Sequence, residues 1–159
     1  MLTTTFALAK KGGACEESYK KFAKNVGGIT KYGRNTPIPL TDILGVLGLR
    51  DALWCLWVTP KEQDAERDKL ARIFACDCAE HVLHIYEKAY PNDNRPRKAI
   101  TAARLYTEGK ATTEERAAAG DAAWAAASAA AWDTARAAAG DAEKGWQTQH
   151  FRELLKEVN

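Results

Sequence analysis

Apolar residues along this chain recur mostly three and four positions apart, which is the spacing of helices with one buried face. The first such stretch ends at Gly27-Gly28, and the residues on its apolar face are Cys15, Tyr19, Phe22 and Val26. Residues 29–38 contain glycine, asparagine and proline and are expected to form a loop. A short helix is then predicted from Pro39 to Leu47, because proline fits the first helical turn and Gly48 follows the last one.

The segment from Leu49 to Val58 is apolar on almost every side. A strand is conceivable there, but its residues also match the helical template i, i+3, i+4, i+7 and i+8. The matching positions are Leu49, Ala52, Leu53, Leu56 and Trp57. We therefore expect a fully buried helix, and we assign Trp54 and Trp57 to the core.

Two segments have the pattern of a capping box, in which a threonine and a glutamate three residues later bond each other's backbone amides. Thr59 and Glu62 are expected to begin a long helix that runs to about Ala89. Its buried stripe is expected to include Leu70, Ile73, Phe74, Val82, Ile85 and Tyr86. Thr112 and Glu115 form the second box.

The last third of the chain is dominated by alanine, which fills 17 of the 32 positions from Ala111 to Ala142. Alanine favours helix but buries little surface, so larger side chains must supply the packing. The candidates are Trp124, Trp132 and Trp146, followed by an amphipathic end with Phe151, Leu154, Leu155 and Val158 that is expected to pack back onto the body. Glycines predict a kink or break near residues 140–145.

These elements predict an all-α fold, a single-domain helical bundle over residues 1–159. Its parts are an N-terminal helical and loop region (1–50), central helices (51–109) and the alanine- and tryptophan-rich C-terminal helices (112–159). A chain of this length buries about two-thirds of its unfolded surface, so its core needs neither disulfides nor a metal.

The net charge of +2 gives no general drive toward nucleic acid or membrane. Residues 1–34 nevertheless carry seven bases and two acids, which is +5 and leaves −3 for the rest. This basic region suits an acidic partner, with nucleic acid as a further alternative, but a solvated helix surface is the favoured interpretation. Neither a secretory signal nor a membrane-spanning segment is recognised, so we expect a cytoplasmic protein with its four cysteines reduced.

Asp77, His81 and His84 are spaced four and three residues apart on the long helix, which places them on one surface. They are candidate ligands for a metal. The neighbouring Cys76 and Cys78 point about 200° apart on a helix, and neither HExxH nor paired CxxC is present. We therefore expect no metal, no cofactor and no catalytic residue, with the thiols in the core and the histidines bonded to carboxylates or carbonyls.

A further helix is predicted from Arg95 to about Thr107, with Asp93 or Asn94 as its N-cap. Arg95 and Arg97 at its start suit a partner's carboxylate or phosphate, or pair with carboxylates of the preceding helix. Trp124 and Trp132 lie about 80° apart around a helix, so one of them can face solvent. The candidate partner-binding residues are therefore Asp93, Arg95, Arg97, Trp124 and Trp132.

The stretch CDCAEHVLHIYE at residues 76–87, followed by YPNDNRPRKAI at 90–100, is similar to a family of small alanine-rich helical proteins named as immunity proteins. These occur in bacterial toxin loci and in phages, and they share a P-x-D-x-R-P-R-x-A-I core. The resemblance covers residues 70–146. It implies a non-enzymatic inhibitor that binds a protein target, either a toxin or a defence effector.

Three alternatives stay open. A phage counter-defence inhibitor of the anti-CRISPR type would act by the same kind of contact on a different target. A metal-dependent enzyme or sensor would use Asp77, His81 and His84. A nucleic-acid-binding protein would use the basic N-terminal region.

Overall fold

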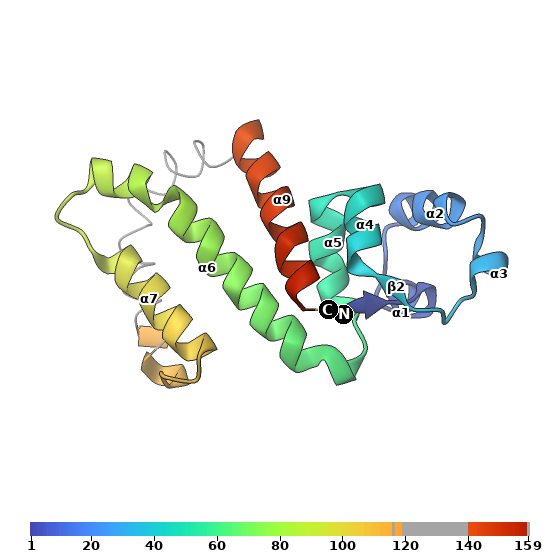
Figure 1. Ribbon diagram of the computed structural model, residues 1–159, viewed down its shortest axis with the longest axis horizontal. Coiled ribbons are helices and arrows are strands. Elements are labelled where there is room, and N and C mark those ends of the chain that lie inside the picture. Colours follow the sequence, from blue (N-terminus) through green and yellow to red (C-terminus); the bar gives the residue numbers. More distant parts are fainter. Residues whose placement is uncertain (116, 119–139, 159) are drawn as a thin grey trace. The chain divides into compact units, whose positions relative to one another are not determined.

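The computed structural model of the protein describes residues 1–115, 117–118 and 140–158 (Figure 1). Nearly all regular structure in these ranges is helical, so the all-α fold predicted from the apolar spacing is confirmed. The chain divides into two compact units, Met1–Leu70 with Gln147–Asn159 and Ala71–Trp146. The single domain expected over residues 1–159 stays a prediction.

The first unit is built from short elements joined by tight turns. In chain order they are β1 (Thr3–Thr4), α1 (Phe6–Lys11), α2 (Glu16–Asn25), α3 (Ile29–Tyr32), β2 (Ile38–Pro39), α4 (Leu40–Leu47), α5 (Leu49–Cys55) and two 3-10 turns, η1 (Leu56–Val58) and η2 (Lys61–Gln63). β1 and β2 pair antiparallel, with Thr4 opposite Ile38. The loop expected over residues 29–38 is wrong at both ends, because α3 begins at Ile29 and β2 begins at Ile38. The strand partner of β2 is so distant in the sequence that a local pattern does not reveal it.

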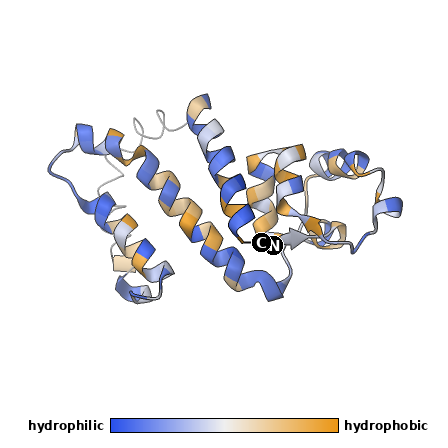
Figure 2. Ribbon diagram, viewed as in Figure 1, coloured by the Kyte–Doolittle hydropathy of each residue, from blue (hydrophilic) through white to orange (hydrophobic). Residues whose placement is uncertain are grey.

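The core of the first unit draws on residues from both ends of the chain. Its buried apolar side chains include Leu2, Phe6, Phe22, Ile38, Leu40, Ile43, Leu44, Ala52, Phe151, Leu154 and Leu155. The last three lie on α9 (Asp141–Glu157), so the predicted burial of the final amphipathic helix is confirmed, although Val158 is only half-buried. Figure 2 shows apolar residues gathered on α4 and α5. The Met1 ammonium donates to the Val158 carbonyl at 2.9 Å, so the two ends of the chain lie side by side (Figure 1).

The helix α5 is shorter than the apolar pattern predicts. It ends at Cys55, and the next three residues form the 3-10 turn η1. A 3-10 turn holds 3.0 residues rather than 3.6, so the side chains after Cys55 leave the face that a regular helix would give them. Trp57 is 82% exposed, and its predicted place in the core is wrong, whereas Trp54 is half-buried.

The capping box predicted at Thr59 does not form. The Thr59 hydroxyl donates to the carbonyl of Leu56 at 3.2 Å, and α6 (Asp64–Ala89) begins only after η2. The Gln63 side chain within η2 instead makes two hydrogen bonds with Thr3, each 2.9 Å long. The Thr3 backbone amide donates to Gln63 Oε1, and Gln63 Nε2 donates to the Thr3 hydroxyl. This contact across the first unit replaces the local cap that the sequence suggests.

The second unit contains most of α6, all of α7 (Arg95–Thr107) and the start of α9 up to Trp146. Its buried α6 side chains are Phe74, Cys76, Leu83 and Tyr86. Ile73, Val82 and Ile85, which were expected in this stripe, are only half-buried. Apolar residues occupy so many positions of α6 that the spacing alone does not fix which side faces the core.

The turn after α7 matches its sequence signals. Gly109 has a φ of +72°, a conformation that glycine adopts without strain, and the chain leaves the helix there. The amide of Thr112 then donates to the Glu115 carboxylate at 2.8 Å, and the Glu115 amide donates to the Thr112 hydroxyl at 3.2 Å. The capping box predicted for this pair is confirmed.

Candidate partner-binding surface

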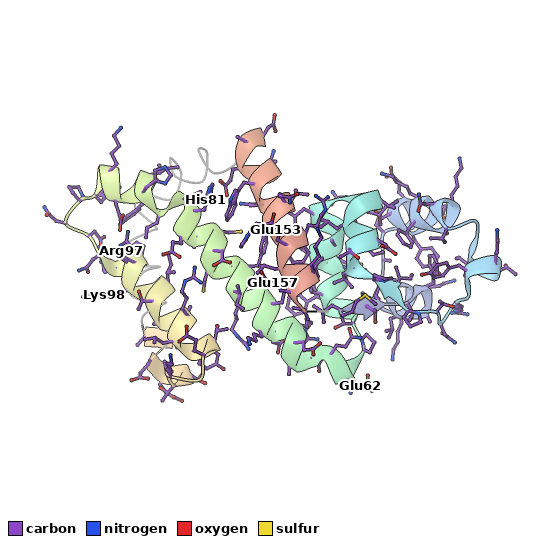
Figure 3. All side chains as sticks on the ribbon, viewed as in Figure 1. Glu62, His81, Arg97, Lys98, Glu153 and Glu157 are labelled. Atoms are coloured by element: carbon purple, nitrogen blue, oxygen red, sulfur yellow. The ribbon has the colours of Figure 1, made fainter. Side chains whose placement is uncertain are left out.

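The connection between α6 and α7 brings the candidate residues Asp93, Arg95 and Arg97 to one place. We define the α6–α7 corner by Glu87, Tyr90, Asp93, Arg95 and Arg97. Figure 3 labels Arg97 on α7, where it lies in the first turn of the helix. All five residues belong to the second unit, so their geometry is internal to one compact body.

Asp93 is the centre of the hydrogen-bond network at this corner. Its Oδ1 accepts from the Arg95 backbone amide at 3.0 Å and from Arg95 Nε at 2.9 Å. Its Oδ2 accepts from Arg95 Nη2 and from the Tyr86 hydroxyl, each at 2.7 Å. Asn94 occupies the N-cap position without a side-chain bond, so Asp93 caps α7 from one residue earlier.

These bonds set the protonation of both acids in the network. The bonds from Arg95, followed by that from Tyr86, hold the pKa of the Asp93 carboxyl well below its usual range. The same contact raises the pKa of the Tyr86 hydroxyl, because its proton is shared with a carboxylate. Asp93 is therefore an anion at every physiological pH, and Arg95 is fixed beside it.

Arg97 is fixed in the same way by a carboxylate of the preceding helix. Its Nε donates to Glu87 Oε1 at 2.6 Å and its Nη2 donates to Glu87 Oε2 at 2.8 Å. This bidentate contact lowers the pKa of Glu87. The expectation that the arginines pair with carboxylates of the preceding helix holds for Arg97, whereas Arg95 pairs within the connection.

The corner also presents an aromatic residue that the sequence analysis missed. Tyr90 is 43% exposed, and its ring lies 5.0 Å from that of the buried Tyr86. The side chains of Arg95 and Arg97 are about half exposed although both are paired. The sequence does contain a signal for Tyr90. This aromatic residue directly precedes Pro91, and helices usually end at or before the residue that precedes a proline. The other two candidate residues, Trp124 and Trp132, lie outside the described residues.

The three candidate metal ligands have separate partners. Asp77 accepts a 2.6 Å bond from Arg104, and His84 Nδ1 lies 3.0 Å from the carbonyl of His81. His81, labelled in Figure 3, pairs through Nδ1 with Glu143 at 2.7 Å. Within the ranges that the structure describes, no three histidine, cysteine or acidic side chains gather closely enough to hold a metal ion.

His81 lies between two residues from the start of α9. Besides its contact with Glu143, its ring stacks on that of Trp146 with 3.8 Å between centroids and 6° between planes. Glu143 is 9% exposed, so this acid is buried where it meets the imidazole. The expectation that a histidine bonds a carboxylate is confirmed here, but Glu143 is 62 residues away and no local pattern indicates it.

Cys78, His81 and Glu143 have the residue types of a cysteine-based catalytic triad. Burial raises the pKa of the Cys78 thiol to about 11, and the charges of Glu143 and Asp77 add to this effect. A nucleophilic cysteine needs a lowered pKa, because the thiolate is the reactive form. The environment of Cys78 therefore disfavours the chemistry that its neighbours suggest.

The α6–α7 corner lies in the part of the chain that matches a family model. The family model described as Imm-5 like putative immunity protein matches residues 61–153, which is more than half of the chain. The chain therefore belongs to this family, and the resemblance inferred from the motif around Asp93 is confirmed. Neither a curated protein nor a solved structure matches it. None of the helices in the described ranges is long and apolar enough to cross a membrane.

Proposed function

We propose that this chain is a non-enzymatic inhibitor that neutralises a protein toxin by binding it through the α6–α7 corner. The observation that carries the proposal is the exposed ring of Tyr90 beside two arginines that are already fixed by carboxylates. Tyrosine and arginine are enriched among the residues that dominate binding energies. Family membership supports the immunity role, and the corner supplies a surface for it.

The internal ion pairs prepare the arginines for a partner. A side chain that is ordered before binding loses less conformational entropy when the complex forms. A guanidinium has five N–H donors. Arg97 uses one donor on Nε and one on Nη2 to bond Glu87, so its other donors stay available to a partner. Arg95 uses its donors on Asp93 in the same way.

The charge of the corner indicates the chemistry of the target surface. Arg95 and Arg97 are balanced by Asp93 and Glu87, while Lys88 and Lys98 next to them are exposed and add positive charge. An acidic patch on the target with carboxylates or carbonyls within reach of the arginines complements this arrangement. A counter-defence inhibitor would need the same complementarity, so it differs from an immunity protein in its target and not in the surface used.

The test is protection from the toxin. We take the proposed target to be a toxin encoded by the gene adjacent to this one. That toxin is expressed in a bacterial host, with and without the chain, and growth is measured. The proposal predicts that the chain restores growth and that Arg97→Ala does not. Lys20→Ala, which removes an exposed ion pair with Glu16 in α2, is the matched control and restores growth. Failure of the wild-type chain to protect, or equal protection by Arg97→Ala, contradicts the proposal.

A further inference from the structure

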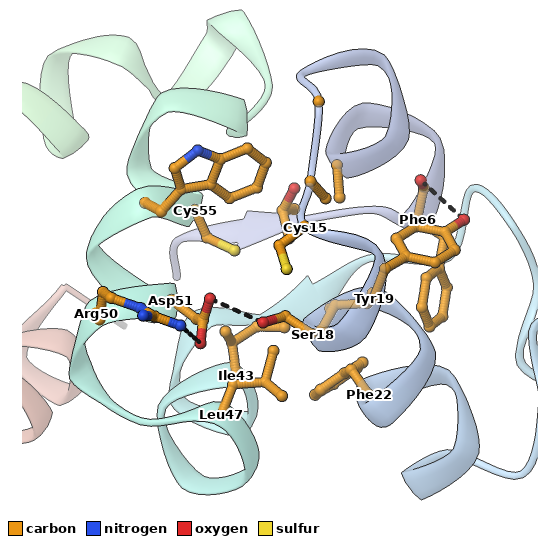
Figure 4. A pocket seen from close by; sticks show the side chains of 16 residues that line it. Phe6, Cys15, Ser18, Tyr19, Phe22, Ile43, Leu47, Arg50, Asp51 and Cys55 are labelled. Carbon is orange, nitrogen blue, oxygen red and sulfur yellow. Dashed lines mark hydrogen bonds and ion pairs between the residues drawn. The ribbon is translucent and has the colours of Figure 1, made fainter.

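The first unit contains a pocket of about 400 Å³ that is independent of the corner (Figure 4). Its walls come from residues 4–55, so it lies wholly outside the segment 61–153 that matches the family. Most of the wall is apolar, with aromatic and branched side chains that include Phe6, Tyr19, Phe22, Ile43, Leu47 and Trp54. Its volume is that of a site for a small molecule.

Three polar side chains of this pocket meet in one cluster. The Ser18 hydroxyl donates to Asp51 Oδ1 at 3.1 Å, and Arg50 Nη2 lies 3.8 Å from Asp51 Oδ2 (Figure 4). The second distance is longer than a hydrogen bond, so Arg50 and Asp51 form an ion pair with no hydrogen bond between them. The Asp51 side chain is 19% exposed and that of Arg50 is 88% exposed.

A carboxylate beside a guanidinium complements a ligand that carries a cationic group and an anionic group close together. We propose that the pocket binds a free α-amino acid with a large apolar side chain. The α-ammonium group donates to Asp51, the α-carboxylate accepts from Arg50, and the side chain lies among the aromatic rings.

Ligands with only one of the two charges fit this cluster less well. An apolar amine brings its ammonium group close to the Arg50 guanidinium with no carboxylate of its own to offset the repulsion. An apolar acid brings its carboxylate close to the mostly buried Asp51 carboxylate, which repels it. A peptide terminus has only one of the two groups, so a free amino acid is favoured over a protein end. The apolar wall then selects phenylalanine, leucine or tryptophan over polar amino acids.

Titration calorimetry on the full chain tests this inference with L-phenylalanine as the probe. We expect saturable binding, and we expect 2-phenylethylamine and 3-phenylpropionate to bind about tenfold more weakly or worse, because each lacks one charged contact. Arg50→Gln changes an exposed side chain and leaves the fold intact, and it should weaken L-phenylalanine binding to a similar extent. Asp51→Asn should do the same.

Arg97→Ala is the control, because it alters the corner and leaves the pocket unchanged. It should bind L-phenylalanine like the wild-type chain, which separates this inference from the proposed inhibitor function. The inference is overturned if neither L-phenylalanine, L-leucine nor L-tryptophan binds at millimolar concentration. It is also overturned if the amine binds as well as the amino acid or if Arg50→Gln binds unchanged.

Discussion

Arg97 and Glu87 face each other through two parallel hydrogen bonds of 2.6 and 2.8 Å, which join the first turn of α7 to the last turns of α6. The pair lies at the surface, where such contacts add little to stability. Its effect is to hold the guanidinium of Arg97 in one orientation. The account therefore predicts that changes at this pair affect target binding more than folding.

Arg97→Lys separates the two effects. Lysine keeps the charge but loses the planar fork that bonds both oxygens of Glu87. Thermal unfolding should be nearly unchanged, while the affinity for the adjacent gene product should fall about tenfold or more. A variant that unfolds at the wild-type temperature and also binds with wild-type affinity would show that the fork has no role in recognition.

Asp93 and Asn94 compete for the role of helix cap, and the structure assigns it to Asp93. Asp93→Asn should lower the free energy of unfolding, because it removes the charge that Arg95 and Tyr86 contact. Asn94→Ala should change it by no more than about 0.5 kcal/mol, since the Asn94 side chain makes no capping bond. Urea unfolding of both variants measures the difference, and an equal effect would place the cap elsewhere.

The stabilisation from Asp93 depends on pH with a definite sign. Its folded-state pKa is lowered, chiefly by the bonds from Arg95. The contribution is therefore fully present above the unfolded pKa of about 3.9 and is lost as the pH falls through the folded value. The gap in unfolding free energy between the wild-type chain and Asp93→Asn should be largest at pH 7 and smaller near pH 2.5. A gap that stays constant over this range would contradict the network.

His81 and His84 are three residues apart but differ in what they contact. His81→Ala removes a bond to the buried Glu143 and a stacked ring on Trp146, and should lower the free energy of unfolding by about 1–3 kcal/mol. His84→Ala removes only a local contact to a backbone carbonyl and should cost about 0.5 kcal/mol or less. Urea unfolding compares them. A metal site shared by both histidines would instead make the two variants similar.

The four cysteines should differ in their reaction with iodoacetamide at pH 8. Cys15 is exposed at the start of α2, and backbone bonds from Ser18 and Glu17 lower its pKa, so it should react first. Burial raises the pKa of Cys55 to about 12 and that of Cys78 to about 11. For Cys78 this lowers the thiolate fraction about a hundredfold relative to an ordinary thiol. Peptide mass spectrometry over time gives the order, and equal labelling of Cys78 and Cys15 would contradict it.

Local signals predicted the elements that depend on neighbouring residues. Helical spacing gave the all-α fold, and the capping box at Thr112 and Glu115 forms as its pattern indicates. The same pattern at Thr59 and Glu62 does not form a cap, because Thr59 bonds back to Leu56 and α6 begins later. A capping motif therefore forms its cap only where no other hydrogen bond competes for its residues.

The features missed by the sequence analysis depend on contacts between distant residues. The pairing of His81 with Glu143 joins residues that no spacing rule relates. The apolar spacing predicts a buried Trp57 only for a regular helix, and the change to a 3-10 turn exposes its side chain. The motif around Asp93 identified the corner, but the fixed orientation of its arginines needed the structure.

The most direct test of the account is the affinity of Tyr90→Ala for the adjacent gene product, measured by titration calorimetry. Trp57→Ala is the matched control, since it removes another exposed aromatic ring, which belongs to the first unit and not to the corner. Circular dichroism of both variants confirms the helical fold before binding is measured. The account predicts at least a tenfold loss of affinity for Tyr90→Ala and wild-type affinity for Trp57→Ala. Unchanged binding by Tyr90→Ala would contradict recognition through the corner.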